Sequence, residues 1–315
     1  MNHVTRLALA AVIGLAAVGC EHSQSGPAPV SARAAAPAGV AAATPASRLD
    51  RSGTVEERLA RLEEAYNKNA EALDFLSKVY AQQKAQQEAA ERDEPAPDAM
   101  FAVAIADDVK AGQVDGPASA PVTIVKAFDF ACPYCQRMSG TMEELVKEYK
   151  GKVRVVYTNL LVHPPAKPAH LASCAAARQG KYNEFKHAFW DKGFLPYAQT
   201  RDESKLGEAN ILAIAKDLGL DTARLKTDMA SAECEARIQR DMAELSRFHV
   251  NATPTFFING KFIGGALPKE ELERIIDEQL KIAEASGVAG ADYYDKVVLA
   301  KGERQFRSKL DPRPK

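Results

Sequence analysis

Two cysteines separated by two residues, Cys132-Pro133-Tyr134-Cys135, are the side chains of this protein best suited to chemistry. They follow a β-branched segment at 122–128 and begin a segment with helical spacing. A thiol in the first turn of a helix faces unpaired backbone N–H groups and the positive end of the helix dipole, which lower its pKa. We therefore expect Cys132 to be an attacking thiolate, with Pro133 at the first helical position. Cys135 follows one turn later, where it can resolve a mixed disulfide by intramolecular attack.

Other uses of this cysteine pair stay open. A zinc site takes two such pairs or histidines at ligand spacing. The chain has a single pair, and none of its 6 histidines stands near another in a ligand pattern. We therefore expect no metal and no other cofactor, while a short structural disulfide remains an alternative. Asp129, three residues before Cys132, is either an acid–base or charge partner of the thiols or an ordinary strand-end aspartate.

The segments that must position the pair predict an α/β domain. Strands at 122–128 and 153–157 flank a helix whose apolar residues recur at helical spacing, and this order indicates a parallel βαβ unit. Two short strands come later, around Asn259-Gly260, a dipeptide that strongly favours a hairpin.

Between these strands, the segment 166–248 predicts several helices. Breaks are expected at Gly180, around 193–196 and at Gly219, where glycine or proline interrupts the apolar pattern. A last helix is expected over 268–283.

Two stretches resemble the DsbA-like branch of the thioredoxin superfamily: FDFACPYC at 128–135 and VNATPTFFING at 250–260. The resemblance covers 122–284. It implies an α/β thioredoxin fold with a helical insertion at 166–248. A helical heptad segment, which the resemblance does not cover, is expected before this fold.

The resemblance also implies that the Thr253–Pro254 peptide bond is cis and lies beside the cysteine pair. A proline at a strand entry has no N–H to donate, which leaves neighbouring backbone free to pair with a substrate strand. Pro254 is therefore expected to act in catalysis with Cys132 and Cys135. Pro133, Tyr134, Thr253 and Asp129 are expected in supporting roles.

Cys174 and Cys234 both fall in predicted helices of the insertion. Some DsbA-like proteins carry a second, structural disulfide in this region, and the resemblance implies one here. Such a bridge would stabilise the fold by about 4 kcal/mol in the chain-entropy estimate. Two separate buried thiols are the alternative.

The implied function is thiol–disulfide exchange with exported cysteine-containing proteins, served by an unidentified membrane redox partner. The direction stays open between an oxidase and an isomerase or reductase. The Pro133-Tyr134 dipeptide lacks the histidine that strongly oxidising relatives place second, and Thr253 resembles isomerase-type relatives. A non-catalytic, lipid-anchored binding protein that uses the fold for recognition is the alternative function.

The N-terminal region indicates export. Residues 1–19 have one arginine followed by an apolar run too short to span a bilayer, typical of a signal peptide. Cys20 follows small residues in a pattern that resembles a bacterial lipobox, which predicts a lipid anchor on the periplasmic side of a membrane. Residues 20–53 predict a flexible tether. The net charge of −1 argues against nucleic-acid binding.

The remaining segments are expected to lie outside the compact domain. Residues 54–92 carry apolar residues at heptad spacing, with Asn69 in the seam, and predict a helix that could form a homo-oligomeric coiled coil. A lone amphipathic helix packed on its own domain is the alternative. Residues 93–121 are expected to form a linker, and 285–315 a surface tail.

Overall fold

The computed structural model describes residues 50–313. The expected signal peptide at 1–19, the lipidation site Cys20 and most of the tether at 20–53 lie outside the described residues. The chain divides into two units, Met1–Asp74 and Phe75–Lys315. Helix α1 (Val55–Asp93) begins in the first unit and ends in the second.

Helix α1 begins with a capping box. The Thr54 N–H donates to the Glu57 carboxylate at 2.9 Å, and the Glu57 N–H donates to the Thr54 hydroxyl at 3.3 Å. None of the 39 residues of the helix is buried. The sequence prediction of a helix at 54–92 therefore agrees with α1, which exposes its apolar positions.

The second unit is built on a five-stranded sheet in the order β1-β3-β2-β4-β5. Strands β2 and β3 are parallel, β4 is antiparallel to β2, and β5 returns from β4 through the Asn259-Gly260 turn. The strands are β1 (Val114–Asp115), β2 (Val122–Phe128), β3 (Val153–Asn159), β4 (Thr255–Ile258) and β5 (Lys261–Gly264). The predicted thioredoxin fold with its βαβ unit is confirmed.

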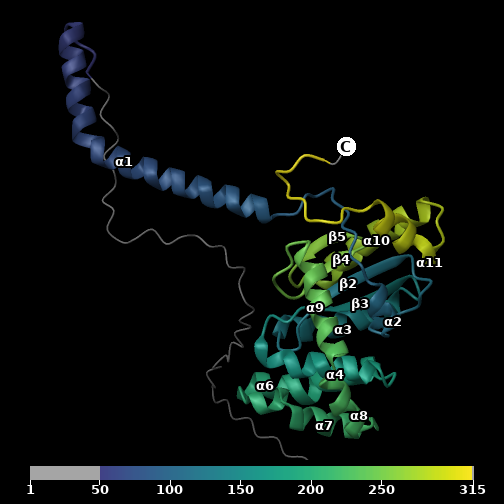
Figure 1. Ribbon diagram of the computed structural model, residues 1–315. Helices are drawn as coiled ribbons and strands as arrows, with labels where there is room; N and C mark the ends of the chain where they lie inside the picture. Colours follow the sequence, from purple (N-terminus) through teal and green to yellow (C-terminus); the bar gives the residue numbers. More distant parts are fainter. Residues whose placement is uncertain (1–49, 314–315) are drawn as a thin grey trace, which may run out of the picture. The chain divides into compact units, whose positions relative to one another are not determined.

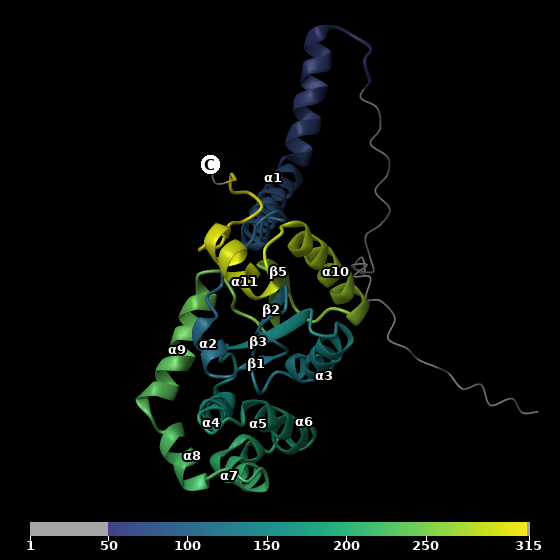
Figure 2. The same ribbon diagram turned by 90° about the vertical axis from the view of Figure 1, so that its right-hand side faces the viewer.

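The helical insertion between β3 and β4 is also present, and its helices form a layer of their own at one end of the sheet (Figures 1 and 2). Its last helix, α9, runs from that layer back toward the sheet. The helices of the second unit are α2 (Ala106–Lys110), α3 (Pro133–Glu148), α4 (Lys167–Ala177), α5 (Tyr182–Phe189), α6 (Leu195–Thr200), α7 (Glu208–Asp217), α8 (Thr222–Met229), α9 (Ala232–Ser246), α10 (Lys269–Ala285) and α11 (Gly290–Tyr293).

One expected helix break is absent. Gly180 and Gly219 follow the ends of α4 and α7 with positive φ, as a helix C-terminus often requires. Around 193–196, however, the chain continues from α5 through a π-helical turn, Trp190–Phe194, directly into α6. The π-turn shifts the backbone pairing, so that Pro196 falls in the first turn of α6, where its missing N–H costs little.

The sheet carries a core on each face, because alternate strand residues point to opposite sides. Ile124 and Phe128 of β2 contact one core, which α3 and the insertion complete. Val125 and Ala127 contact the other. Cys132 and Cys135 belong to the first core.

The structure contradicts the expected linker at 93–121. Phe101, Val103 and Ile105 are buried in the second core, and the segment also contains α2 and the edge strand β1. The Phe101 N–H donates to the Gly260 carbonyl at 2.8 Å. Prolines and aspartates give this stretch the composition of a linker, yet alternating apolar residues bind it to the sheet.

The expected surface tail at 285–315 is also wrong in its first half. Tyr293, Tyr294 and Val298 are buried in the second core. The Tyr294 hydroxyl donates to the Val103 carbonyl at 2.8 Å. The Ala102 N–H donates to the Glu303 carbonyl at 2.8 Å, and the Glu303 N–H donates to the Met100 carbonyl at 2.7 Å. The aromatic side chains supply the apolar area that fixes a segment of otherwise polar composition.

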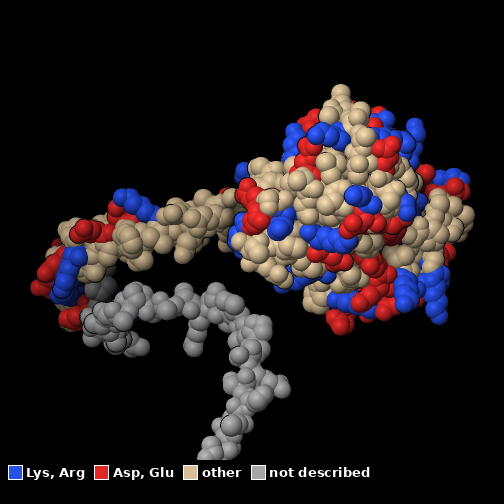
Figure 3. Space-filling model, turned by 90° about the horizontal axis from the view of Figure 1, so that it is seen from below, with Lys and Arg blue, Asp and Glu red and all other residues tan. Residues whose placement is uncertain are grey.

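Charged side chains of both signs are intermixed over the face of the second unit seen in Figure 3. Among the described residues, no helix is long and apolar enough to cross a membrane.

Candidate active site

Cys132 is the N-cap residue of α3. Its backbone is extended, with φ −88° and ψ 119°, and its sulfur accepts a hydrogen bond from the Cys135 N–H at 3.4 Å. Pro133 occupies the first turn of the helix, as expected. Only 3% of Cys132 is exposed, and Cys135 is fully buried beneath it. Both cysteines are unpaired thiols in the structure.

The two thiols are strongly different in acidity. A hydrogen bond from the Cys135 thiol, aided by contacts with Thr253 and with the N–H groups of Cys135 and Tyr134, lowers the pKa of Cys132 to about 5. Burial raises the pKa of Cys135 well above its ordinary value, and its hydrogen bond to Cys132 raises it further. At neutral pH the pair therefore consists of one thiolate, at the helix N-terminus, and one buried thiol.

The Thr253–Pro254 bond is cis and stands beside this pair. The Cys132 sulfur lies 3.3 Å from the Thr253 carbonyl oxygen, to which it can donate only in its protonated form. The Pro254 carbonyl accepts from the Gly265 N–H at 2.9 Å, next to the start of β4. The structure thus brings together the two segments on which the sequence resemblance rested.

Asp129 is fully buried, and its carboxylate holds two loops together. It accepts from the Ala131 N–H at 2.7 Å, from the Val162 N–H at 2.7 Å and from the His163 N–H at 2.8 Å. These bonds tie the loop before Cys132 to the loop that follows β3. The geometry favours the role of a strand-end anchor over that of an acid–base partner.

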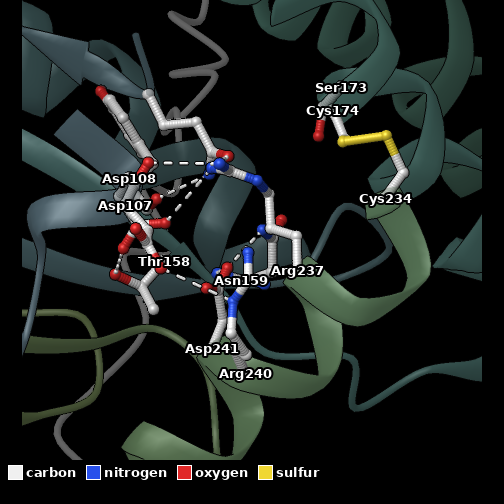
Figure 4. A network of polar contacts seen from close by, with 12 residues as sticks. Asp107, Asp108, Thr158, Asn159, Ser173, Cys174, Cys234, Arg237, Arg240 and Asp241 are labelled. Carbon is white, nitrogen blue, oxygen red and sulfur yellow. Dashed lines mark hydrogen bonds and ion pairs between the residues drawn. A yellow bond between two sulfur atoms is a disulfide. The ribbon is translucent and has the colours of Figure 1, made fainter. Parts of the chain in front are cut away.

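A series of buried polar side chains, which the sequence did not predict, also holds the loop before Cys132. His170 accepts from the Phe130 N–H at 3.4 Å and faces the Asn159 side-chain oxygen at 2.9 Å. Asn159 in turn donates to Asp241 at 2.6 Å, a contact visible in Figure 4. Burial lowers the pKa of His170 to about 4, so the ring is neutral and can accept with one nitrogen while donating with the other.

A thioredoxin family model matches residues 108–278, just over half of the chain. This chain belongs to the thioredoxin family.

Curated relatives match the same region. The Na(+)/H(+) antiporter NhaA of Herminiimonas arsenicoxydans is 31% identical over 170 residues, which are 54% of this chain and 26% of that protein. NhaA 3 of Salinispora tropica is 38% identical over 151 residues, 47% of this chain and 22% of that protein. The chain therefore spans about a quarter of the length of these relatives.

Similar solved structures include a thioredoxin-like oxidoreductase from Silicibacter pomeroyi and BdbD from Bacillus subtilis. The first is 30% identical with a TM-score of 0.45, covering 53% of this chain and 91% of that one. The second is 22% identical with a TM-score of 0.48, covering 60% of this chain and 99% of that one.

In this thioredoxin-family domain, a buried lysine lies under the cysteine pair. Lys126 of β2 is 1% exposed and donates to the Cys135 carbonyl oxygen at 3.2 Å. Burial lowers the pKa of Lys126 to about 8. The one signal in the sequence is a lysine in the middle of the apolar strand Val122–Phe128, where a charged residue is out of place.

The other two cysteines that the structure describes form a disulfide. Cys174 of α4 and Cys234 of α9 are joined across 60 residues of sequence, as the resemblance implied, and Figure 4 shows the bond. It links two helices of the insertion rather than any part of the catalytic pair. In the described part of the chain, no group of three or more His, Cys, Asp or Glu residues could hold a metal ion.

Exposed apolar side chains lie close in sequence to the active-site loops. Tyr134, between the two cysteines, is 52% exposed, and Val162 is 40% exposed. The Arg137 guanidinium lies 4.4 Å from the centre of the Tyr134 ring.

Proposed function

We propose that this chain is a protein thiol–disulfide oxidoreductase that reacts through Cys132 and Cys135. The observation that carries the proposal is the asymmetry of the pair. Cys132, at the N-terminus of α3, has a pKa of about 5, whereas Cys135 is a buried thiol. Cys132 also lies beside the segment Thr253–Pro254. A structural short disulfide would need neither the acidic thiol nor the neighbouring cis-proline segment.

The exchange proceeds in two displacements. A substrate thiolate attacks Cys132 of the oxidised pair, the intramolecular S–S bond breaks, and Cys135 leaves with the electron pair. A second substrate thiolate then attacks the mixed disulfide and releases Cys132 as a thiolate. Two electrons pass from the substrate to the pair, and the substrate gains a disulfide. Run backward, the same steps reduce or rearrange a substrate disulfide.

The activity is tested with a reduced dithiol peptide and the oxidised full chain. We expect stoichiometric peptide oxidation by the wild type and none by Cys132→Ala. Pro254→Ala is expected to accumulate mixed disulfides with the peptide, detected on non-reducing gels. If the wild type fails to oxidise the peptide and to reduce a disulfide-containing one, the non-catalytic binding function is left as the account of the fold.

We further propose that the substrates are exported cysteine-containing proteins and that a membrane protein restores the pair. This rests on the signal-peptide pattern of residues 1–19 and on Cys20, which would anchor the chain to a bacterial membrane facing the periplasm. Metabolic labelling with a radioactive fatty acid checks the anchor. Incorporation that disappears in Cys20→Ala supports it, and an unlabelled wild type contradicts it.

We propose that α1 joins copies of this chain. Eight large apolar residues of the helix are between 44% and 72% exposed, namely Val55, Leu59, Leu62, Tyr66, Leu73, Phe75, Leu76 and Tyr80. A helix of 39 residues that buries none of them leaves an apolar stripe in water. Full burial of one such side chain is worth about 1.5–3 kcal/mol, which favours association.

Sedimentation of a chain beginning after Cys20 tests this association. We expect an oligomer at tens of micromolar and a monomer for the double variant Leu62→Glu, Leu76→Glu. The matched control, Ala60→Glu with Ala81→Glu, adds the same charges outside the heptad seam and should stay oligomeric. A monomeric wild type would refute the association.

A further inference from the structure

The buried sulfur of Cys135 has one cationic neighbour that acts on its charge. Burial and the hydrogen bond to Cys132 both oppose ionisation of Cys135, whereas the ammonium of Lys126 favours it. Lys126 is held in place by its bond to the Cys135 carbonyl oxygen at 3.2 Å. The cation therefore belongs to the same buried cluster as the resolving thiol.

Lys126 differs from the other fully buried lysine of this domain. Lys186 has a carboxylate partner, Asp115, at 2.7 Å, and lies 3.7 Å from the centre of the Tyr157 ring. Among the described residues, Lys126 has no carboxylate within ion-pair distance, and it lies 5.8 Å from the same ring. A buried cation without a carboxylate is costly unless an anion forms beside it. Of the groups whose negative charge favours the Lys126 ammonium, Cys135 acts most strongly, followed by Cys132 and then by the Glu143 carboxylate.

We propose that Lys126 is an electrostatic positioning residue that stabilises the Cys135 thiolate each time the active-site disulfide opens or closes. The proposal rests on the proposed thiol–disulfide exchange and concerns the step in which the buried Cys135 carries the charge. The helix N-terminus stabilises the Cys132 thiolate, and Lys126 stabilises the Cys135 thiolate.

Lys126 acts at one step when the active-site disulfide opens and at one step when it closes. When a substrate thiolate attacks Cys132, Cys135 takes the electron pair of the broken S–S bond and becomes a thiolate facing the ammonium. When a mixed disulfide on Cys132 resolves, Cys135 must first lose its proton to solvent and then attack, closing the disulfide and expelling the other thiolate. Over a full oxidation of substrate, two electrons enter the pair. One substrate proton ends on Cys135, and the other is released because Cys132 stays ionised.

The charge of Lys126 is present at neutral pH. Burial and the neighbouring Lys186 together lower its pKa to about 8, against the opposing effects of Cys135, Cys132 and Glu143. Lys126 is thus protonated when Cys132 is already a thiolate. Replacing it by methionine removes the charge but keeps a side chain of similar length, and loss of an unpaired buried cation should not unfold the domain.

The test separates the two thiols by their order of reaction with 5,5′-dithiobis(2-nitrobenzoate). Excess reagent and the reduced protein release one chromophore as Cys132 forms a mixed disulfide, and a second as Cys135 resolves it. For Lys126→Met we expect a first-phase rate within about threefold of the wild type. The second phase should be at least about tenfold slower at pH 7, and its pH profile should move at least about one unit upward, since a tenfold loss of thiolate is one pKa unit.

Lys147→Met is the matched control, because Lys147 is an exposed lysine on α3 and its loss should leave both phases unchanged. Circular dichroism checks that Lys126→Met is folded, and Lys126→Gln provides a second neutral side chain if it is not. A folded neutral variant with a wild-type second phase would overturn the role of Lys126. A wild type that shows no first phase would instead overturn the proposed function itself.

Discussion

The acidity of Cys132 is predicted to depend on the thiol of its neighbour. The largest cause that lowers the pKa of Cys132 to about 5 is a hydrogen bond from the Cys135 side chain. Cys135→Ala removes this donor and leaves the helix N-terminus in place. A hydrogen bond to a charged group is worth about 1.5–3 kcal/mol, which corresponds to about 1–2 pKa units. We therefore expect the pKa of Cys132 to rise to between about 6 and 7 in this variant.

Thiolate absorbance at 240 nm, followed as a function of pH, measures this shift directly, and the pH dependence of alkylation by iodoacetamide gives an independent midpoint. Cys135→Ser is the control, because its hydroxyl can still donate, and its midpoint should stay near that of the wild type. Equal midpoints in Cys135→Ala and the wild type would refute the assignment of the shift to the Cys135 thiol. A wild-type midpoint near 9 would refute the acidic thiolate altogether.

Three further predictions concern the pair, the disulfide and the second core. Because Cys132 is ionised above pH 5 and Cys135 is not, the reduction potential should fall by about 30 mV per pH unit near neutrality and by about 59 mV below pH 5, measured against glutathione. A single slope of about 59 mV through pH 7 would contradict this. Replacing Cys174 and Cys234 together by alanine should lower the free energy of unfolding in urea by up to about 4 kcal/mol, with the reaction rate of Cys132 unchanged. Phe101→Ala should cost about 3–5 kcal/mol in the same assay, whereas a residue of a true linker would cost almost nothing.

The positions of Cys132 and Cys135 could be predicted from the sequence because their geometry depends on neighbouring residues of the chain. Cys132 reaches a helix N-terminus through its place between a strand and Pro133, and Cys135 follows by one turn of the same helix. Thr253 was located by the motif of the family rather than by any local rule. Its approach to Cys132 depends on a contact between residues 121 positions apart, which no short-range pattern encodes.

Lys126 and His170 were missed for a different reason. Each is a polar side chain whose partner is supplied by the fold: the backbone of α3 for Lys126, and β3 with the loop after β2 for His170. A lysine in a strand of seven buried residues signals that something unusual is nearby, but not what it faces. Phe101 was missed for the opposite reason. It is an apolar residue in proline-rich surroundings, and nothing in the local sequence indicated which sheet face it covers.

The bond from the Tyr294 hydroxyl to the Val103 carbonyl joins residues 191 positions apart. A chain made from its N-terminus leaves the ribosome with Phe101 and its neighbours long before the residues that hold them. The part of the second core that Tyr293, Tyr294 and Val298 fill therefore cannot be completed until the last tens of residues have been synthesised. The catalytic loop, β2, β3 and the insertion are complete well before that point. The part of the domain that carries the cysteine pair is thus made before the residues that complete the far side of its sheet.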